Sequence, residues 1–163
     1  MKRFRDTELH NCIMIALGLM FCNSLVGAVD TLLVFFLQAK LPERGIPAGL
    51  LGLALLFIQM GGIVGSKLIL KLPKASYRWI FTGAVARVAT GFLAEHSPLY
   101  WVMALGGFLS AVGDDALQVR TNAILQDMFP SEQRATLTSV ESFTFSVIMI
   151  VLSPLAGIVF IYW

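Results

Sequence analysis

The stretch Tyr100–Ile124 reads YWVMALGGFLSAVGDDALQVRTNAI, an apolar run with two adjacent acids and an arginine in its second half. A helix needs about 20 predominantly apolar residues to cross a bilayer, and this run is long enough to do so. Charged side chains inside such a run are costly, so they usually face another helix or a water-filled cavity. The stretch therefore predicts a transmembrane helix whose acids, Asp114 and Asp115, lie against protein.

The composition of the whole chain also indicates a lipid environment. Of its 163 residues, 57 % are hydrophobic and only 13 % are charged, and the mean hydropathy is +0.79. A soluble domain needs more charged side chains than this to cover its surface. The net charge of +2 is too small to indicate a nucleic-acid partner. We expect an integral membrane protein whose main partner is the lipid bilayer, with no nucleic acid bound.

Several further stretches have the length and apolar character of a membrane-spanning helix. Helices satisfy every backbone amide within the segment, whereas barrel strands would be shorter and would alternate polar with apolar residues. The breaks between the stretches carry proline or charge and are short, so neighbouring helices should be antiparallel. We expect an all-α polytopic membrane protein in which residues 1–163 form a single transmembrane domain. The five predicted spans are residues 11–37, 48–70, 77–94, 99–124 and 137–160.

Basic residues predict the orientation of these spans, because cytoplasmic loops are enriched in Lys and Arg. With a cytoplasmic N-terminus, only Lys40 and Arg44 fall outside, and the odd number of spans puts the C-terminus outside. The protein is expected in the cell membrane. An odd number of helices that ends at Trp163 without a polar tail also suggests part of a longer protein. The cytoplasmic set is Lys2, Arg3, Arg5, Lys67, Lys71, Lys74, Arg78, Arg120 and Arg134.

Polar residues inside the spans are candidates for a substrate or proton pathway. Arg87 shares a helical face with Gly83 and Gly91, which allow close helix contact, so it should point into protein. Arg87 and one of the two adjacent acids would form a buried ion pair, or the acids would carry protons or bind a substrate; the spacing leaves both interpretations open. The candidates are Asp30, Gln59, Arg87, Asp114, Asp115, Gln118, Asn122 and Glu141.

Sequence motifs for covalent catalysis and metal binding are missing from the chain. Residues 61–67 read GGIVGSK, but a phosphate loop requires lysine before the serine or threonine. His10 and His96 are isolated from each other and from any Cys or Glu at metal-ligand spacing. No GxSxG or HExxH pattern occurs. We therefore expect no enzyme activity, no metal and no cofactor.

The segment 129–139, FPSEQRATLTS, resembles the P-x-x-x-R-A/G-T/S-x-x-S segment between the tenth and eleventh helices of major facilitator superfamily transporters. In that family Pro130 and Ser131 would stop one helix and cap the next, with Arg134 at the cytoplasmic boundary. The order of spans and loops extends the resemblance over the whole chain, which is similar to helices seven to eleven, an incomplete C-terminal half-bundle. The resemblance implies a secondary transporter that moves a small solute by alternating access, with proton coupling as one mode and Asp114 as its best candidate.

Two consequences of the resemblance concern the rest of the carrier. The cavity of such a transporter lies between two halves, so an N-terminal half or a second copy would be required for transport, and the substrate is not specified by this half. Residues 61–67 also resemble the family's G-G-x-x-G-D-R loop motif, with Ser66 in place of the acid. The residues matched to loop motifs are Gly61, Gly62, Gly65, Lys67, Lys71, Pro130 and Arg134.

Two further patterns bear on function. Ser24-Leu25-Val26-Gly27, followed by Asp30, parallels Ser110-Ala111-Val112-Gly113, followed by Asp114, on helices of opposite direction, as inverted repeats would give. Ordinary packing between membrane helices explains the GGxxG cluster at Gly61, Gly62 and Gly65. The same face would serve the alternative function, a small non-transporting scaffold or regulatory subunit.

Overall fold

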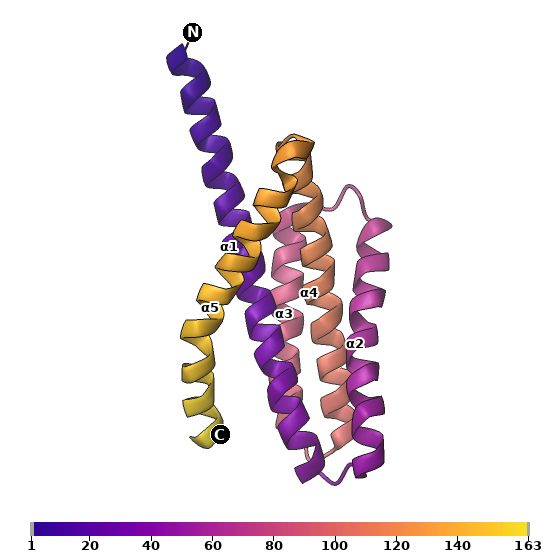
Figure 1. The fold of residues 1–163 in the computed structure, drawn as a ribbon. Helices are drawn as coiled ribbons and strands as arrows, with labels where there is room; N and C mark the ends of the chain where they lie inside the picture. Colours follow the sequence, from indigo (N-terminus) through magenta and orange to yellow (C-terminus); the bar gives the residue numbers. More distant parts are fainter. Residues whose placement is uncertain (1, 163) are drawn as a thin grey trace.

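The computed structural model describes the backbone of residues 2–162 and the side chains of residues 10–159. The chain folds into a bundle of long helices joined by short connections, and no strand occurs in the described backbone (Figure 1). The predicted all-α fold is confirmed. The elements are α1 (Lys2–Glu43), α2 (Ala48–Leu70), α3 (Tyr77–Glu95), α4 (Tyr100–Met128), a 3-10 turn (Ser131–Gln133) and α5 (Arg134–Tyr162).

Each predicted span corresponds to one of these helices. The described residues of α1, α2, α4 and α5 are long and apolar enough to cross a membrane, which makes this a membrane protein. The helix α3 has 19 residues that include Arg78, Arg87 and Glu95, and its composition leaves it outside that group. The structure therefore contains the helix predicted at 77–94, but four described helices, not five, have the character of a span.

The helix α4 is the centre of the bundle. It packs against α1, α2 and α3, whereas α5 packs mainly against α1. Figure 1 shows α5 crossing α1 obliquely, with its C-terminal half standing apart from α4. Half of the most apolar window of α4 is buried, compared with 6 % of the corresponding window of α5. The helices α1 to α4 thus form the packed core, and α5 is attached to it at one side.

The connection between α1 and α2 is a tight, well-defined turn. Gly45 has φ of +87°, a conformation that glycine adopts without steric cost. The Ile46 amide donates to Leu41 O across 3.4 Å and the Gly45 amide donates to Pro42 O across 3.1 Å, the pattern of a Schellman motif. Leu41 and Ile46 then join a buried cluster with Leu37 and others. This turn returns the chain directly along α4.

The glycines of α2 form its contact face against α4. A Cβ placed on Gly61 would overlap Phe108 O, and one placed on Gly65 would overlap Val112 O. Only glycine lets the two backbones approach this closely. The GGxxG face is therefore occupied inside the bundle, so the predicted use of this face to bind other membrane helices is wrong for this fold.

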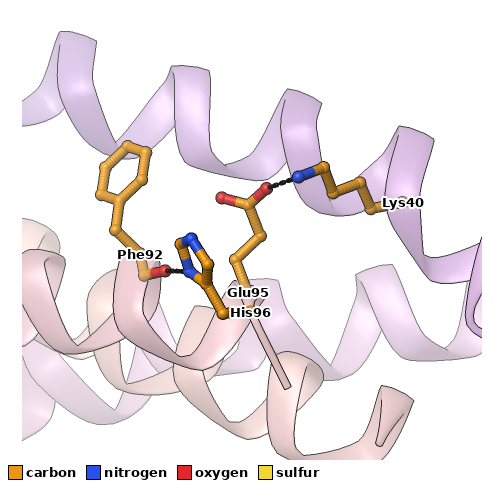
Figure 2. Close-up of polar contacts among 4 residues, drawn as sticks. All are labelled: Lys40, Phe92, Glu95 and His96. Carbon is orange, nitrogen blue, oxygen red and sulfur yellow. Dashed lines mark hydrogen bonds and ion pairs between the residues drawn. The ribbon is translucent and has the colours of Figure 1, made fainter. Parts of the chain in front are cut away.

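A buried ion pair joins α1 to α3 at the end of the bundle opposite the N-terminus. Lys40 Nζ lies 2.9 Å from Glu95 Oε1, and the Glu95 side chain is only 2 % exposed (Figure 2). Beside it, the His96 ring contacts Phe92 O through Nδ1 at 3.0 Å, which closes the end of α3. Lys40 was predicted to lie in an outer loop, but α1 continues to Glu43 and carries Lys40 in its last turns.

The opposite end of the bundle holds the connections that were predicted to be cytoplasmic. Pro130 follows the end of α4, as expected, but Ser131 opens a 3-10 turn and its hydroxyl does not cap α5, which begins at Arg134. Arg134 donates to Gln126 O across 3.4 Å and so ties the start of α5 to α4. Lys67 and Lys71 are exposed at this end. The side chains of Lys2, Arg3 and Arg5 lie outside the described residues.

Candidate functional site

A polar cavity of about 520 Å³ lies between α1, α4 and α5. Asp114, which lines it, lies about 21 Å along α4 from Tyr100 at a rise of about 1.5 Å per residue, close to the middle of that helix. Polar surface at such a depth is unusual in helices of this composition. The lining residues are Asn23, Ser24, Gly27, Thr31, Asp114, Gln118, Asn122, Thr138, Glu141, Ser142, Phe145 and Ser146.

The cavity arises because each of its helices turns one polar stripe toward it. On α4 the lining positions recur every four residues, at Asp114, Gln118 and Asn122, and on α1 they recur at intervals of three and four residues. On α5 they recur at intervals of three and four residues, from Thr138 to Ser146. The remaining faces of α5 carry exposed apolar side chains such as Phe143 and Ile150. The stripes meet where α5 crosses α1.

The two carboxylates of the cavity lie against α1. Asn23 Nδ2 donates to Glu141 Oε1 across 2.7 Å and links α1 to α5. The Asp114 carboxylate lies over Gly27, where a Cβ added to the glycine would stand 3.4 Å from Asp114 Oδ1. The absence of a side chain at Gly27 leaves room for this carboxylate beside α1. Asp114 and Glu141 are the charged residues among the described lining, and none of that lining is basic.

Two buried polar atoms of the lining have no hydrogen-bond partner. Ser24 is 3 % exposed and Asn23 is 5 % exposed, and neither Ser24 Oγ nor Asn23 Oδ1 is satisfied. Buried polar groups in native proteins almost always have a partner, which is protein, water or ligand. Both residues border the cavity. A molecule in the cavity can therefore supply the missing hydrogen bonds to these two atoms.

Four of the predicted pathway residues meet in this cavity, and four do not. Asp114, Gln118, Asn122 and Glu141 line it. The buried Asp30 instead accepts a hydrogen bond from Ser110, which ties α1 to α4.

The other predicted residues lie elsewhere in the bundle. Gln59 is exposed on α2. The Asp115 carboxylate occupies the space beside Gly62, at the contact between α2 and α4. Arg87 donates to Gly83 O within its own helix across 3.2 Å, and its Cβ packs near Gly113. An ion pair of Arg87 with Asp114 or Asp115, predicted as one possibility, is therefore not formed among the described side chains.

Several lining residues were not predicted from the sequence: Asn23, Ser24, Gly27, Thr31, Thr138, Ser142, Phe145 and Ser146. A search for charged and amide groups inside the spans misses seven of these eight residues because they carry neither group, and it also overlooked Asn23, whose side chain is an amide. Their spacing carried the signal, since small and polar residues recur at helical intervals on one face of α1 and one face of α5.

Comparison of the chain with protein-family models, curated proteins and solved structures finds no match.

Proposed function

We propose that the protein is a secondary active transporter of the major facilitator type, which moves a small solute across the cell membrane by alternating access. The observation that carries the proposal is the polar cavity at mid-height between α1, α4 and α5. Carriers of this kind bind their substrate near the bilayer midplane in cavities lined by several helices. The cavity volume of about 520 Å³ is also in the usual range for small-molecule sites.

The arrangement of α5 supports a moving part. It is held to the core mainly by α1, through the Asn23–Glu141 hydrogen bond and an apolar cluster that includes Met20 and Leu137. A displacement of α5 against α1 changes the access to the cavity without separating α4 from α2 and α3. Transport also requires a second bundle on the open side, either an N-terminal half or a second copy of this chain.

Asp114 is proposed as the proton-coupling residue. Its carboxylate faces the cavity and is not matched by a basic side chain there, so protonation is one way to neutralise it. We expect Asp114→Asn to abolish transport driven by a pH gradient while leaving membrane insertion intact, because asparagine is permanently neutral. Proton flux evoked by a panel of small solutes is measured with an internal pH-sensitive dye, both in proteoliposomes of this chain and in vesicles from cells that express its complete open reading frame.

Asp115→Asn is the matched control for this measurement. The two acids are adjacent on α4, but Asp115 lies against Gly62 on the α2 side and does not line the cavity. Its removal should leave gradient-driven flux in place. Equal flux for wild type and Asp114→Asn would refute the coupling role, and the absence of flux from every solute in both preparations would refute the transporter itself.

The proposed orientation has a cytoplasmic N-terminus and an outer C-terminus. Lys71 and Lys74 in the connection after α2 lie at one end together with Arg134 at the start of α5, whereas Arg44 in the α1–α2 connection lies at the other. A scaffold function would have to use a surface other than the GGxxG face, since α4 occupies that face.

A further inference from the structure

The acidic groups of the cavity are not balanced by the protein. Asp114 and Glu141 border it, whereas Arg87 packs near Gly113 on another face of α4 and donates to its own helix. Ionised carboxylates at membrane depth are costly unless a positive charge or a proton neutralises them. A proton or a cation that enters the cavity can supply the compensating charge.

Four neutral residues of the lining present hydrogen-bond acceptors to the cavity. The hydroxyl groups of Thr31, Thr138 and Ser146 all donate to main-chain carbonyls of their own helices, at 2.8, 3.1 and 2.9 Å respectively. A hydroxyl has one proton to donate, so these oxygens offer lone pairs to the cavity. Asn23 adds an unpartnered carbonyl oxygen, because its amide nitrogen already donates to Glu141. A ligand that brings N–H or O–H donors matches this wall.

Two serine–aspartate pairs across α1 and α4 locate the open position more closely. In one pair, Ser110 donates to the Asp30 carboxylate. In the other pair, Ser24 and Asp114 both border the cavity, yet no hydrogen bond joins them and Ser24 Oγ is buried without a partner. One serine–aspartate pair is thus joined by a hydrogen bond, whereas the other pair is not. A donor group of a ligand placed between Ser24 and Asp114 would satisfy both.

We propose that the cavity binds an organic cation that carries N–H donors, such as a primary ammonium or guanidinium compound, with Asp114 and Glu141 as its counter-ions. Ser24 Oγ and Asn23 Oδ1 accept its hydrogen bonds, and the ring of Phe145 offers a cation–π contact at the same wall. As a statement about the transported substrate, this inference rests on the proposed function. Binding itself is measured without transport.

The first test uses the wild-type chain in nanodiscs and a matched series of ligands, with binding measured by isothermal titration calorimetry. Putrescine and agmatine supply cationic N–H groups, the diol analogue of putrescine keeps the chain length but has no charge, and tetramethylammonium has a charge but no N–H donor. We expect at least one of the two amines to bind at least tenfold more tightly than the diol and more tightly than tetramethylammonium. Equal binding of amine and diol, or no binding by either amine, overturns the inference.

The second test compares variants with the amine that binds. Asp114→Asn and Glu141→Gln should each weaken its affinity at least tenfold, because each removes one counter-ion of the cation. Asp115→Asn should leave the affinity within about twofold of wild type, since Asp115 lies outside the cavity. An affinity that is unchanged in both Asp114→Asn and Glu141→Gln overturns the inference. If either variant fails to fold, the ligand series on the wild-type chain still decides it.

The two proposals fail in different ways. Selective amine binding without solute-driven flux in the vesicle assay supports the cation site and refutes the transporter. Flux of neutral solutes without selective amine binding refutes the cation site and supports the transporter.

Discussion

At the scale of single residues, buried charge is the most demanding feature of this molecule. Glu95 is almost fully enclosed and Lys40 neutralises it at 2.9 Å, so the two charges enter the apolar bundle together. A buried pair contributes little compared with apolar residues of the same size, but removal of one member leaves an uncompensated charge. The pair therefore constrains how α1 sits against α3.

We expect Lys40→Met to destabilise the protein by about 3–5 kcal/mol, because Glu95 then remains buried without its cation. The double variant Lys40→Met/Glu95→Leu should recover most of this loss, since no buried charge remains. Thermal unfolding in detergent, followed by circular dichroism, measures both. A single variant as stable as wild type would show that water reaches Glu95.

The residue scale is also where sequence reasoning was least complete. The polar residues of α4 and Glu141 were found because charge and amide groups are conspicuous in apolar runs, and they do line the cavity. The contacts of Arg87 depend on how α3 is rotated against α4, and its helical spacing did not determine that rotation. Lys40 was assigned to a loop because the apolar run ends at Leu37, whereas the backbone remains helical to Glu43.

At the scale of elements, the contact between α2 and α4 depends on glycines, which have no side chain to hold the two helices apart. Gly61 and Gly65 lie one turn apart and face carbonyl oxygens of α4, so the backbones themselves are in contact. Hydropathy predicted where these helices lie, since α2 spans Ala48–Leu70 as expected. The sequence left open whether the GGxxG face is used within the chain, because the same pattern serves contacts within and between proteins.

We expect Gly65→Ala to destabilise the bundle by about 1–3 kcal/mol, because the new methyl group would overlap the backbone at Val112, which cannot move aside as a flexible side chain can. Gly52→Ala is the control on the same helix. A Cβ at Gly52 meets nothing within 4 Å, and alanine is the better helix former by about 1 kcal/mol, so this variant should be at least as stable as wild type. Midpoints of unfolding in a detergent titration compare the two; equal losses would contradict the close contact.

At the scale of the whole molecule, the two ends of the bundle differ in charge and the two sides differ in packing. The core of α1 to α4 is closed around α4, while α5 leaves most of its surface uncovered and borders the cavity. The position of α5 against α1 was not predictable from the apolar residues of α5, because apolar side chains occupy nearly every face of this helix. Only its polar stripe, from Thr138 to Ser146, indicated the side that meets the cavity.

The proposed orientation makes a prediction about the C-terminal end of the chain. A green fluorescent protein fused to the C-terminus should stay dark in bacteria, because it would be exported unfolded, whereas alkaline phosphatase at the same position should be active. Replacing Lys71, Lys74 and Arg134 by Gln should weaken this preference, since these residues supply positive charge at the inner end. A bright fluorescent fusion at the C-terminus would reverse the assignment.

The central position of α4 has a consequence for how the protein is made. The helices α1, α2 and α3 leave the ribosome before α4, yet the most extensive contacts of α2 and of α3 are with α4 rather than with each other. Until α4 has been synthesised, the glycine face of α2 lies in the bilayer without the helix that covers it in the folded protein. Membrane insertase factors that shelter early helices are therefore most needed during translation of residues 48–99, and a ribosomal pause after α4 would let the bundle close before α5 arrives.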